Sequence, residues 1–184
     1  MRLNRGLAAG AAALALLVAA CGGSDGSGGD GRATGETKLA HASAATGPGK
    51  AAREVCEPMI RDAVEYEVGA PLEGTPAEVV DGNTFTCTYR VAGGTIVMSV
   101  HDLKRVRLAK NDFAAQRTAA EAAGDVQELP GLGHGAFLRP DGTLVVRKDA
   151  MVLTIDMTGM PDAVDGRDRG TVATNLGVAV MGCW

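Results

Sequence analysis

The feature that most limits what this chain can fold into is a tract with almost no large apolar residues, residues 22–50. It is rich in Gly, Ser, Ala and Thr, begins with Gly-Gly-Ser-Asp-Gly-Ser-Gly-Gly-Asp-Gly, and holds Gly47-Pro48-Gly49 near its end. Such a composition buries too little apolar surface to offset the entropy lost on ordering. A Gly-rich coil of this length would span about 30 Å. We therefore predict a flexible tether, residues 21–50, between a short leader and a folded part.

The part before the tether has the layout of a signal peptide. Arg2 and Arg5 form a short basic segment, and residues 6–18 are an uncharged stretch of Ala, Leu, Gly and Val. This stretch is shorter than the ~20 residues that a stable transmembrane helix requires, and small residues follow it instead of a stop-transfer pattern. We therefore predict that residues 1–20 are a cleaved export signal and not a permanent span.

The end of the leader, Val18-Ala19-Ala20-Cys21, resembles the lipobox of bacterial lipoproteins. The resemblance implies that the Cys21 thiol receives a diacylglyceryl group, with acyl chains such as palmitate, and that cleavage leaves Cys21 first. Each buried methylene contributes about 0.8 kcal/mol, so two acyl chains anchor a protein stably. The expected location is the extracytoplasmic face of the cell membrane. Cleavage by a general signal peptidase, which would leave a free secreted protein, is the alternative.

The net charge of the chain limits the classes of partner that it is expected to bind. The formal charge is -4, and loss of Arg2 and Arg5 with the leader takes it to -6 (-4 minus 2). An acidic chain is a poor partner for nucleic acid. We expect contact with the membrane through lipid on Cys21, and with an unidentified envelope protein or small ligand.

Residues 51–184 are long enough for one domain that buries about two thirds of its unfolded surface. Helical spacing predicts helices over 53–68, 112–123 (capped by Asn111) and 168–181. Alternation predicts a hairpin, 85–90 with 95–100, and a meander over 135–139, 143–148 and 151–157. This order predicts an α+β fold: one small domain with a mainly antiparallel sheet of about five strands and helices packed on one face. The basic run Lys104 to Leu108 fits a strand, a loop or an early helix start.

Three short motifs resemble actinobacterial lipoproteins of a domain family of unknown function. They are the helix that carries Cys56, the strand Cys87-x-Tyr89, and Leu129-Pro130-Gly131-Leu132-Gly133 before a strand pair. The resemblance covers most of the folded part and implies an envelope location and an α+β sheet. It carries no established activity or catalytic residues. The family's usual two cysteines correspond to Cys56 and Cys87, whereas Cys183 departs from the pattern.

Three cysteines follow Cys21, in a compartment where disulfides persist. A Cys56–Cys87 disulfide is the favoured pairing, because it would tie the first helix to the first strand and contribute roughly 3 to 4 kcal/mol in the chain-entropy model. Pairing of Cys183 with Cys56 or Cys87 is the alternative. The chain has no Cys-x-x-Cys, so redox catalysis by the odd cysteine is a minor hypothesis.

The remaining patterns do not indicate a catalytic, metal or cofactor site. His101, Asp102 and His134 could in principle converge on a metal, but they lack local ligand spacing. The loop Gly131-Leu132-Gly133-His134-Gly135 precedes a strand and lacks the Lys-Ser/Thr of a phosphate-binding loop. Ser99 is the only serine after residue 50 and lies outside any Gly-x-Ser-x-Gly turn.

We therefore expect a non-enzymatic binding or interaction module of the cell envelope, without cofactor or metal and with no catalytic residue to name. Two competing hypotheses stay open. One is an envelope hydrolase or redox enzyme that uses His101, His134 or an unpaired cysteine. The other is a structural or sensory module of the cell surface.

Overall fold

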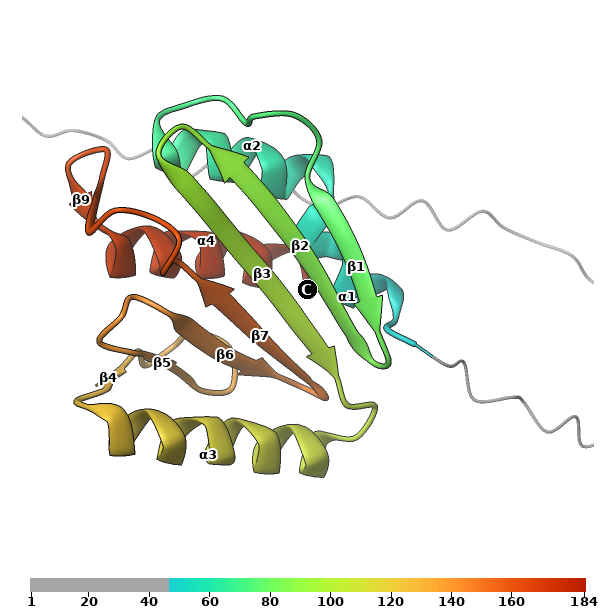
Figure 1. Ribbon diagram of the computed structural model, residues 1–184. Coiled ribbons are helices and arrows are strands. Elements are labelled where there is room, and N and C mark those ends of the chain that lie inside the picture. The colour runs from blue at the N-terminus through green and yellow to red at the C-terminus, as the bar shows by residue number, and fades with distance from the viewer. Residues whose placement is uncertain (1–46) are drawn as a thin grey trace, which may run out of the picture. The chain divides into compact units, whose positions relative to one another are not determined.

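A computed structural model describes residues 47–184 (Figure 1). The predicted signal peptide, Cys21 and all but the last residues of the predicted tether lie outside the described part. The helices are α1 (Lys50–Arg53), the 3-10 turn η1 (Glu54–Cys56), α2 (Pro58–Val68), α3 (Val106–Ala123) and α4 (Arg169–Cys183). Within residues 47–184, none of these helices is both long and apolar enough to cross a membrane.

The strands are β1 (Ala77–Asp81), β2 (Thr84–Val91), β3 (Gly94–Asp102), β4 (Gln127–Glu128), β5 (Ala136–Leu138), β6 (Leu144–Lys148), β7 (Met151–Asp156), β8 (Ala163–Val164) and β9 (Arg167–Asp168). Seven of them form one antiparallel sheet in the order β1-β2-β3-β7-β6-β5-β4, and β8 pairs with β9. Pairing of β3 with β7 joins the predicted hairpin to the predicted meander. The α+β class and the mainly antiparallel sheet are confirmed.

The larger core lies between the sheet and the helices α1, α2 and α4. Alternate residues of each strand point into it, as in the aligned row Cys87, Met98, Ile155 and Leu144 across β2, β3, β7 and β6. The helix α4 contributes Val172, Leu176 and Val180, all fully buried. A Cβ on Gly177 would overlap the Leu144 side chain, so this glycine lets α4 lie close to the sheet.

The opposite face of the sheet has a smaller core under α3. Its buried residues are Ala109, Ala120, Phe137, Val145 and Val152. The rings of Phe113 and Phe137 meet edge to face, with centroids 5.3 Å apart. This corrects the expectation that all helices pack on one face, and the sheet has seven strands instead of about five. Along β6 and β7, Val145 and Val152 alternate with residues that point into the larger core. They therefore form an apolar strip on the opposite face of the sheet, and α3 covers this strip.

The basic run belongs mostly to a helix. Lys104 and Arg105 form a loop, and α3 begins at Val106, five residues before the predicted cap Asn111. Arg105 is the N-cap residue, and its side chain makes no capping hydrogen bond. The predicted cap was wrong because Val106 and Ala109 continue the apolar stripe of the helix, and tertiary packing of Ala109 favours the earlier start.

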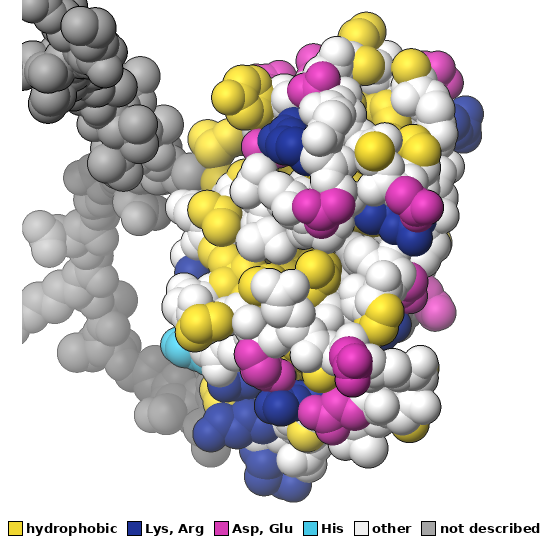
Figure 2. Space-filling model, turned by 90° about the vertical axis from the view of Figure 1, so that its left-hand side faces the viewer, with side chains coloured by type: hydrophobic (Ala, Val, Ile, Leu, Met, Phe, Trp, Pro, Cys, Tyr) yellow, Lys and Arg dark blue, Asp and Glu magenta, His cyan; other side chains and the backbone are white. Residues whose placement is uncertain are grey.

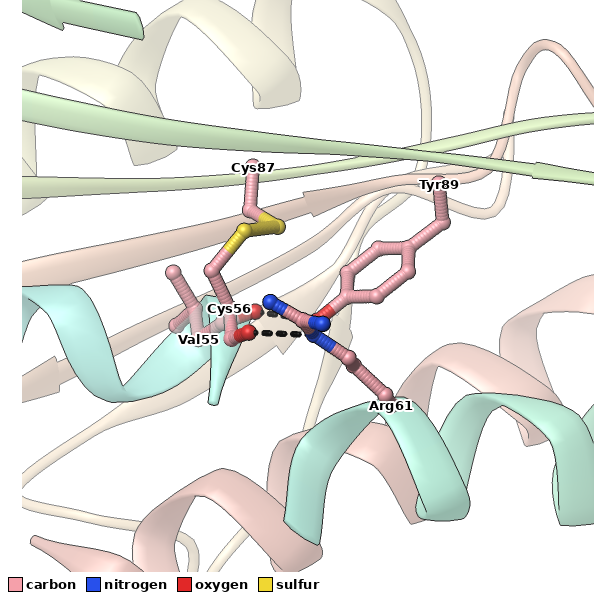
Figure 3. The surroundings of a disulfide bond; sticks show 5 residues. All are labelled: Val55, Cys56, Arg61, Cys87 and Tyr89. Carbon is pink, nitrogen blue, oxygen red and sulfur yellow. Dashed lines mark hydrogen bonds between the residues drawn. A yellow bond between two sulfur atoms is a disulfide. The ribbon is translucent and has the colours of Figure 1, made fainter. Parts of the chain in front are cut away.

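Near the N-terminus of the described part, a disulfide joins Cys56 to Cys87 and so ties η1 to β2 (Figure 3). The hydroxyl of Tyr89, two residues along β2, donates to the Val55 carbonyl at 2.5 Å. The Arg61 Nε donates to the Cys56 carbonyl at 2.8 Å. Burial raises the pKa of Tyr89 well above its usual range, so its phenol stays protonated and able to donate.

Candidate functional site

A groove runs between the β4–β5 edge of the sheet and the first turns of α4; we call it the α4 groove. It consists of two adjoining cavities of about 290 and 230 Å³ that share Leu138, Asp168 and Gly170. On the face that Figure 2 shows, hydrophobic side chains gather near the middle, with acidic and basic side chains around them. The other lining residues are Gln127, Leu129, Arg139, Pro140, Gly142, Asp162, Arg169, Thr171, Thr174 and Asn175.

The first turn of α4 forms one wall because Asp168 caps the helix. The Asp168 carboxylate accepts the Thr171 backbone N–H at 2.8 Å and the Thr171 hydroxyl at 2.6 Å. These hydrogen bonds lower the pKa of Asp168, so the groove carries a fixed negative charge at neutral pH. A Cβ on Gly170 would lie 2.5 Å from the end of the Leu138 side chain, so glycine at this position lets the wall lie close to the strand.

Two arginines lie along the groove. Arg169 is held by Asp162, with Nη2 3.0 Å from the carboxylate, and by the Met160 carbonyl at 3.1 Å. Arg139 reaches Gln116 with Nη2 over a long 3.4 Å, whereas its Nε is buried and has no acceptor within the described residues. A buried donor without a partner is costly in free energy. Arg139 therefore brings a buried hydrogen-bond donor with unused capacity to the lining of this groove.

The lining of the α4 groove combines apolar and polar groups. Leu129, Leu138 and Pro140 provide apolar surface, and carboxylates, guanidinium groups, amides and hydroxyls surround it. The lining contains no histidine, cysteine, serine or lysine, and its ionisable side chains are Asp162, Asp168, Arg139 and Arg169. An apolar floor with a few convergent polar groups is typical of a recognition site.

The two histidines of interest do not meet. His101 lies on β3 with Nδ1 3.7 Å from an Asp112 oxygen, and His134 has its Nδ1 3.7 Å from an Asp149 oxygen. In the sheet, Val152 and then Arg147 lie between His101 and His134, a separation of roughly three strand spacings or ~14 Å. No group of three metal-ligating side chains occurs among residues 47–184.

Asp102, the expected third ligand, has other partners. Its carboxylate accepts the Gly49 N–H at 2.9 Å and pairs with Lys104 Nζ at 2.6 Å. Burial alone would raise the pKa of Asp102, but the hydrogen bonds from Lys104 and from the Gly49 N–H outweigh it and lower this pKa. Asp102 thus fastens the start of the described chain to the end of β3.

The remaining candidates from the sequence, Cys183 and the Gly131–Gly135 loop, make packing and hydrogen-bond contacts within the fold. The Sγ of Cys183 lies 3.2 Å from the Sδ of Met59 at the end of α4. In the Gly131–Gly135 loop, His134 donates its N–H to the Arg147 carbonyl at 2.7 Å, and Arg147 donates to Gly135 at 2.8 Å. Gly133 has a φ of +57° and lies against the Arg147 backbone, so the loop serves close packing on β6.

Sequence reasoning missed the α4 groove because its walls are far apart in the chain: Gln127 and Asp168 are separated by 41 residues (168 minus 127). One local signal was present: Asp168 followed three residues later by Thr171 marks the cap that forms one wall. The strands β4 and β9 have only two residues each, too few to show alternation.

Comparisons of this chain with protein families, with curated proteins and with solved structures find no match.

Proposed function

We propose that this protein is a lipid-anchored extracytoplasmic lipoprotein whose folded domain is a non-enzymatic binding module. The lipobox-like Val18-Ala19-Ala20-Cys21 supports the anchor. The proposed partner is an envelope protein or a small polar ligand, received in the α4 groove.

The observation that carries the binding role is the groove's combination of apolar floor and open hydrogen-bonding capacity. Leu138 and Pro140 offer apolar contact beside Arg139, whose buried Nε has no acceptor in the described part. A carboxylate or carbonyl oxygen from a ligand would supply that acceptor after a small side-chain adjustment. The charge-assisted hydrogen bond would favour binding and give it direction.

The groove is built on a rigid base, which supports recognition without large rearrangement. The Glu67 carboxylate on α2 binds Arg167 on β9 at 2.5 Å and Asn175 on α4 at 3.0 Å. Glu67 is only 9% exposed. This network holds the β8–β9 hairpin and the first half of α4 in one position relative to α2.

The anchor is tested by intact mass measurement of the protein extracted from its native membrane. A diacylglyceryl adduct on a chain that begins at Cys21 is expected, and Cys21→Ser should leave the protein without this adduct. An unmodified thiol on Cys21 in the membrane-extracted protein would overturn the proposal of a lipid anchor.

The groove is tested by cross-linking in native membranes with a blocking variant and a matched control. Gln127→Trp places a bulky ring at the exposed groove margin on β4, and Glu78→Trp places the same ring on the opposite edge strand β1. The expected result is loss of the cross-linked partner with Gln127→Trp and its retention with Glu78→Trp. Equal cross-linking in both variants would contradict a role for the groove.

A further inference from the structure

An exposed basic surface lies where β3 leads into α3. It consists of the side chains Lys104, Arg105, Arg107 and Lys110, which we call the basic patch; all four are exposed, as is Val106 among them (48% exposed). No acidic residue occurs from Leu103 to Asn111. Of the flanking acids, Asp102 pairs with Lys104 of the patch and also accepts the Gly49 N–H, and Asp112 accepts a hydrogen bond from Gln116.

The stability of α3 does not explain this patch. The partial positive charge at a helix start favours acidic residues, yet the first turn of α3 contains none and Arg105 provides no capping hydrogen bond. In contrast, α4 begins with the capping carboxylate of Asp168. The basic residues therefore stand where they slightly destabilise their own helix, which is typical of positions retained for function.

The described chain begins at the end of the sheet where the basic patch lies. Pro48 is buried, and the Gly49 N–H is bound to the carboxylate that also holds Lys104. In Figure 1 the described chain begins on the right, near the end of β3 and the start of α3. The described chain therefore begins, at Gly47, beside the basic patch.

The far end of the sheet has the opposite charge. The loops and helix start on the left of Figure 1 carry five acidic residues, Asp141, Asp156, Asp162, Asp165 and Asp168, against three basic ones, Arg139, Arg167 and Arg169. The α4 groove lies at this acidic end. An anionic surface would attract the basic patch and repel the groove end, and so would orient the domain.

We propose that the basic patch docks on the anionic phospholipid surface to which the chain is attached, and that this contact holds the α4 groove away from the membrane. The orientation rests on the proposed lipid anchor, but the affinity of the patch for anionic lipid does not. Each Lys or Arg side chain near an anionic bilayer makes its own favourable contribution to binding. Val106 adds an apolar contact at the interface.

The test is cosedimentation of the chain from residue 21 onward, carrying Cys21→Ser, with vesicles at millimolar lipid. Vesicles of phosphatidylcholine are compared with vesicles containing 30% phosphatidylglycerol. We expect binding only to the anionic vesicles, weakened by added salt. The variant Arg105→Gln/Arg107→Gln/Lys110→Gln should bind about 100-fold more weakly, since each removed charge changes affinity about fivefold. Arg107→Glu should weaken binding strongly, whereas Arg90→Glu, an equal charge change at an exposed site on β2, should weaken it far less.

Three outcomes would overturn the proposal: no binding to anionic vesicles above that to neutral ones, equal weakening by Arg107→Glu and Arg90→Glu, or wild-type binding by the triple variant. Circular dichroism of each variant checks that the fold is kept. Because Cys21→Ser removes the lipidation site, a failed anchor experiment and a failed docking experiment are distinguishable.

Discussion

The two faces of the sheet are covered very differently. One face lies under α1, α2 and α4, with a continuous set of buried aliphatic and aromatic residues, a disulfide and the Glu67 network. The other lies under α3 alone, whose small core has five buried residues, two of them alanine. Stability is therefore concentrated on the α4 side, and α3 is a light cover whose outer surface is available for charged residues such as the basic patch.

The largest expected effect is on the α4 side. Removal of the disulfide in Cys56→Ala/Cys87→Ala should lower the free energy of unfolding by about 3 to 4 kcal/mol, because the bond closes a loop of 31 residues in the unfolded chain. Urea unfolding measures the loss. Dithiothreitol should destabilise the wild type by a similar amount and leave the double variant unchanged; a variant as stable as the oxidised wild type would show that this side does not depend on the disulfide.

The core under α3 should tolerate truncation of a side chain better than the core under α4. Phe113→Ala is expected to cost about 2 kcal/mol, less than the 3 to 5 kcal/mol of a fully buried phenylalanine, because Phe113 is only half-buried against Phe137. Leu176→Ala, at a fully buried position of α4, is the matched change and should cost about 3 kcal/mol. Thermal unfolding compares the two, and a larger loss for Phe113→Ala would reverse the comparison.

The contacts of Asp102, which join the start of the described chain to the end of β3, should make a pH-dependent contribution to the free energy of unfolding. The pKa of Asp102 is lowered in the folded state, so its stabilising effect is present above the unfolded value near 4 and is lost as pH falls through the folded value. Asp102→Asn should cost about 1 to 2 kcal/mol at pH 6. This difference from wild type should shrink at pH 2.5.

Urea unfolding at pH 6 and pH 2.5 measures that difference. Asp81→Asn, at a nearby exposed carboxylate, is the control and should have little effect at either pH. A constant cost of Asp102→Asn at both pH values would rule out the titration of Asp102 as its cause.

The smallest expected effect concerns the different starts of α3 and α4. Arg105→Asp would give α3 the kind of cap that Asp168 gives α4, and should stabilise the protein by about 0.5 to 1 kcal/mol. Differential scanning calorimetry against Arg90→Asp, which changes charge equally away from a helix start, checks this. The same variant should bind anionic vesicles more weakly, and a gain in both stability and vesicle binding would contradict a functional reason for Arg105.

Much of the fold follows from local pattern. The alternation of Phe85, Cys87 and Tyr89 indicates β2 and its buried side, and the turn Pro140-Asp141-Gly142 separates two strands of the meander as expected. The strand β1 was missed because all its residues are exposed and no apolar alternation marks it. The start of α3 is compatible with either Asn111 as a local cap or an early start within Lys104 to Leu108, and packing of Ala109 on the sheet selects the early start at Val106.

By itself, the sequence determined the α+β class, the hairpin and meander, the favoured pairing of Cys56 with Cys87, and the prediction of an exported lipoprotein, because each rests on periodicity, composition or a contiguous motif. Only the tertiary structure decided that β3 pairs with β7, that α3 covers the second face, that His101 and His134 lie apart, and that Gln127, Leu138 and Asp168 line one groove. These features depend on contacts between segments far apart in the chain, and local residue preferences carry no information about such contacts.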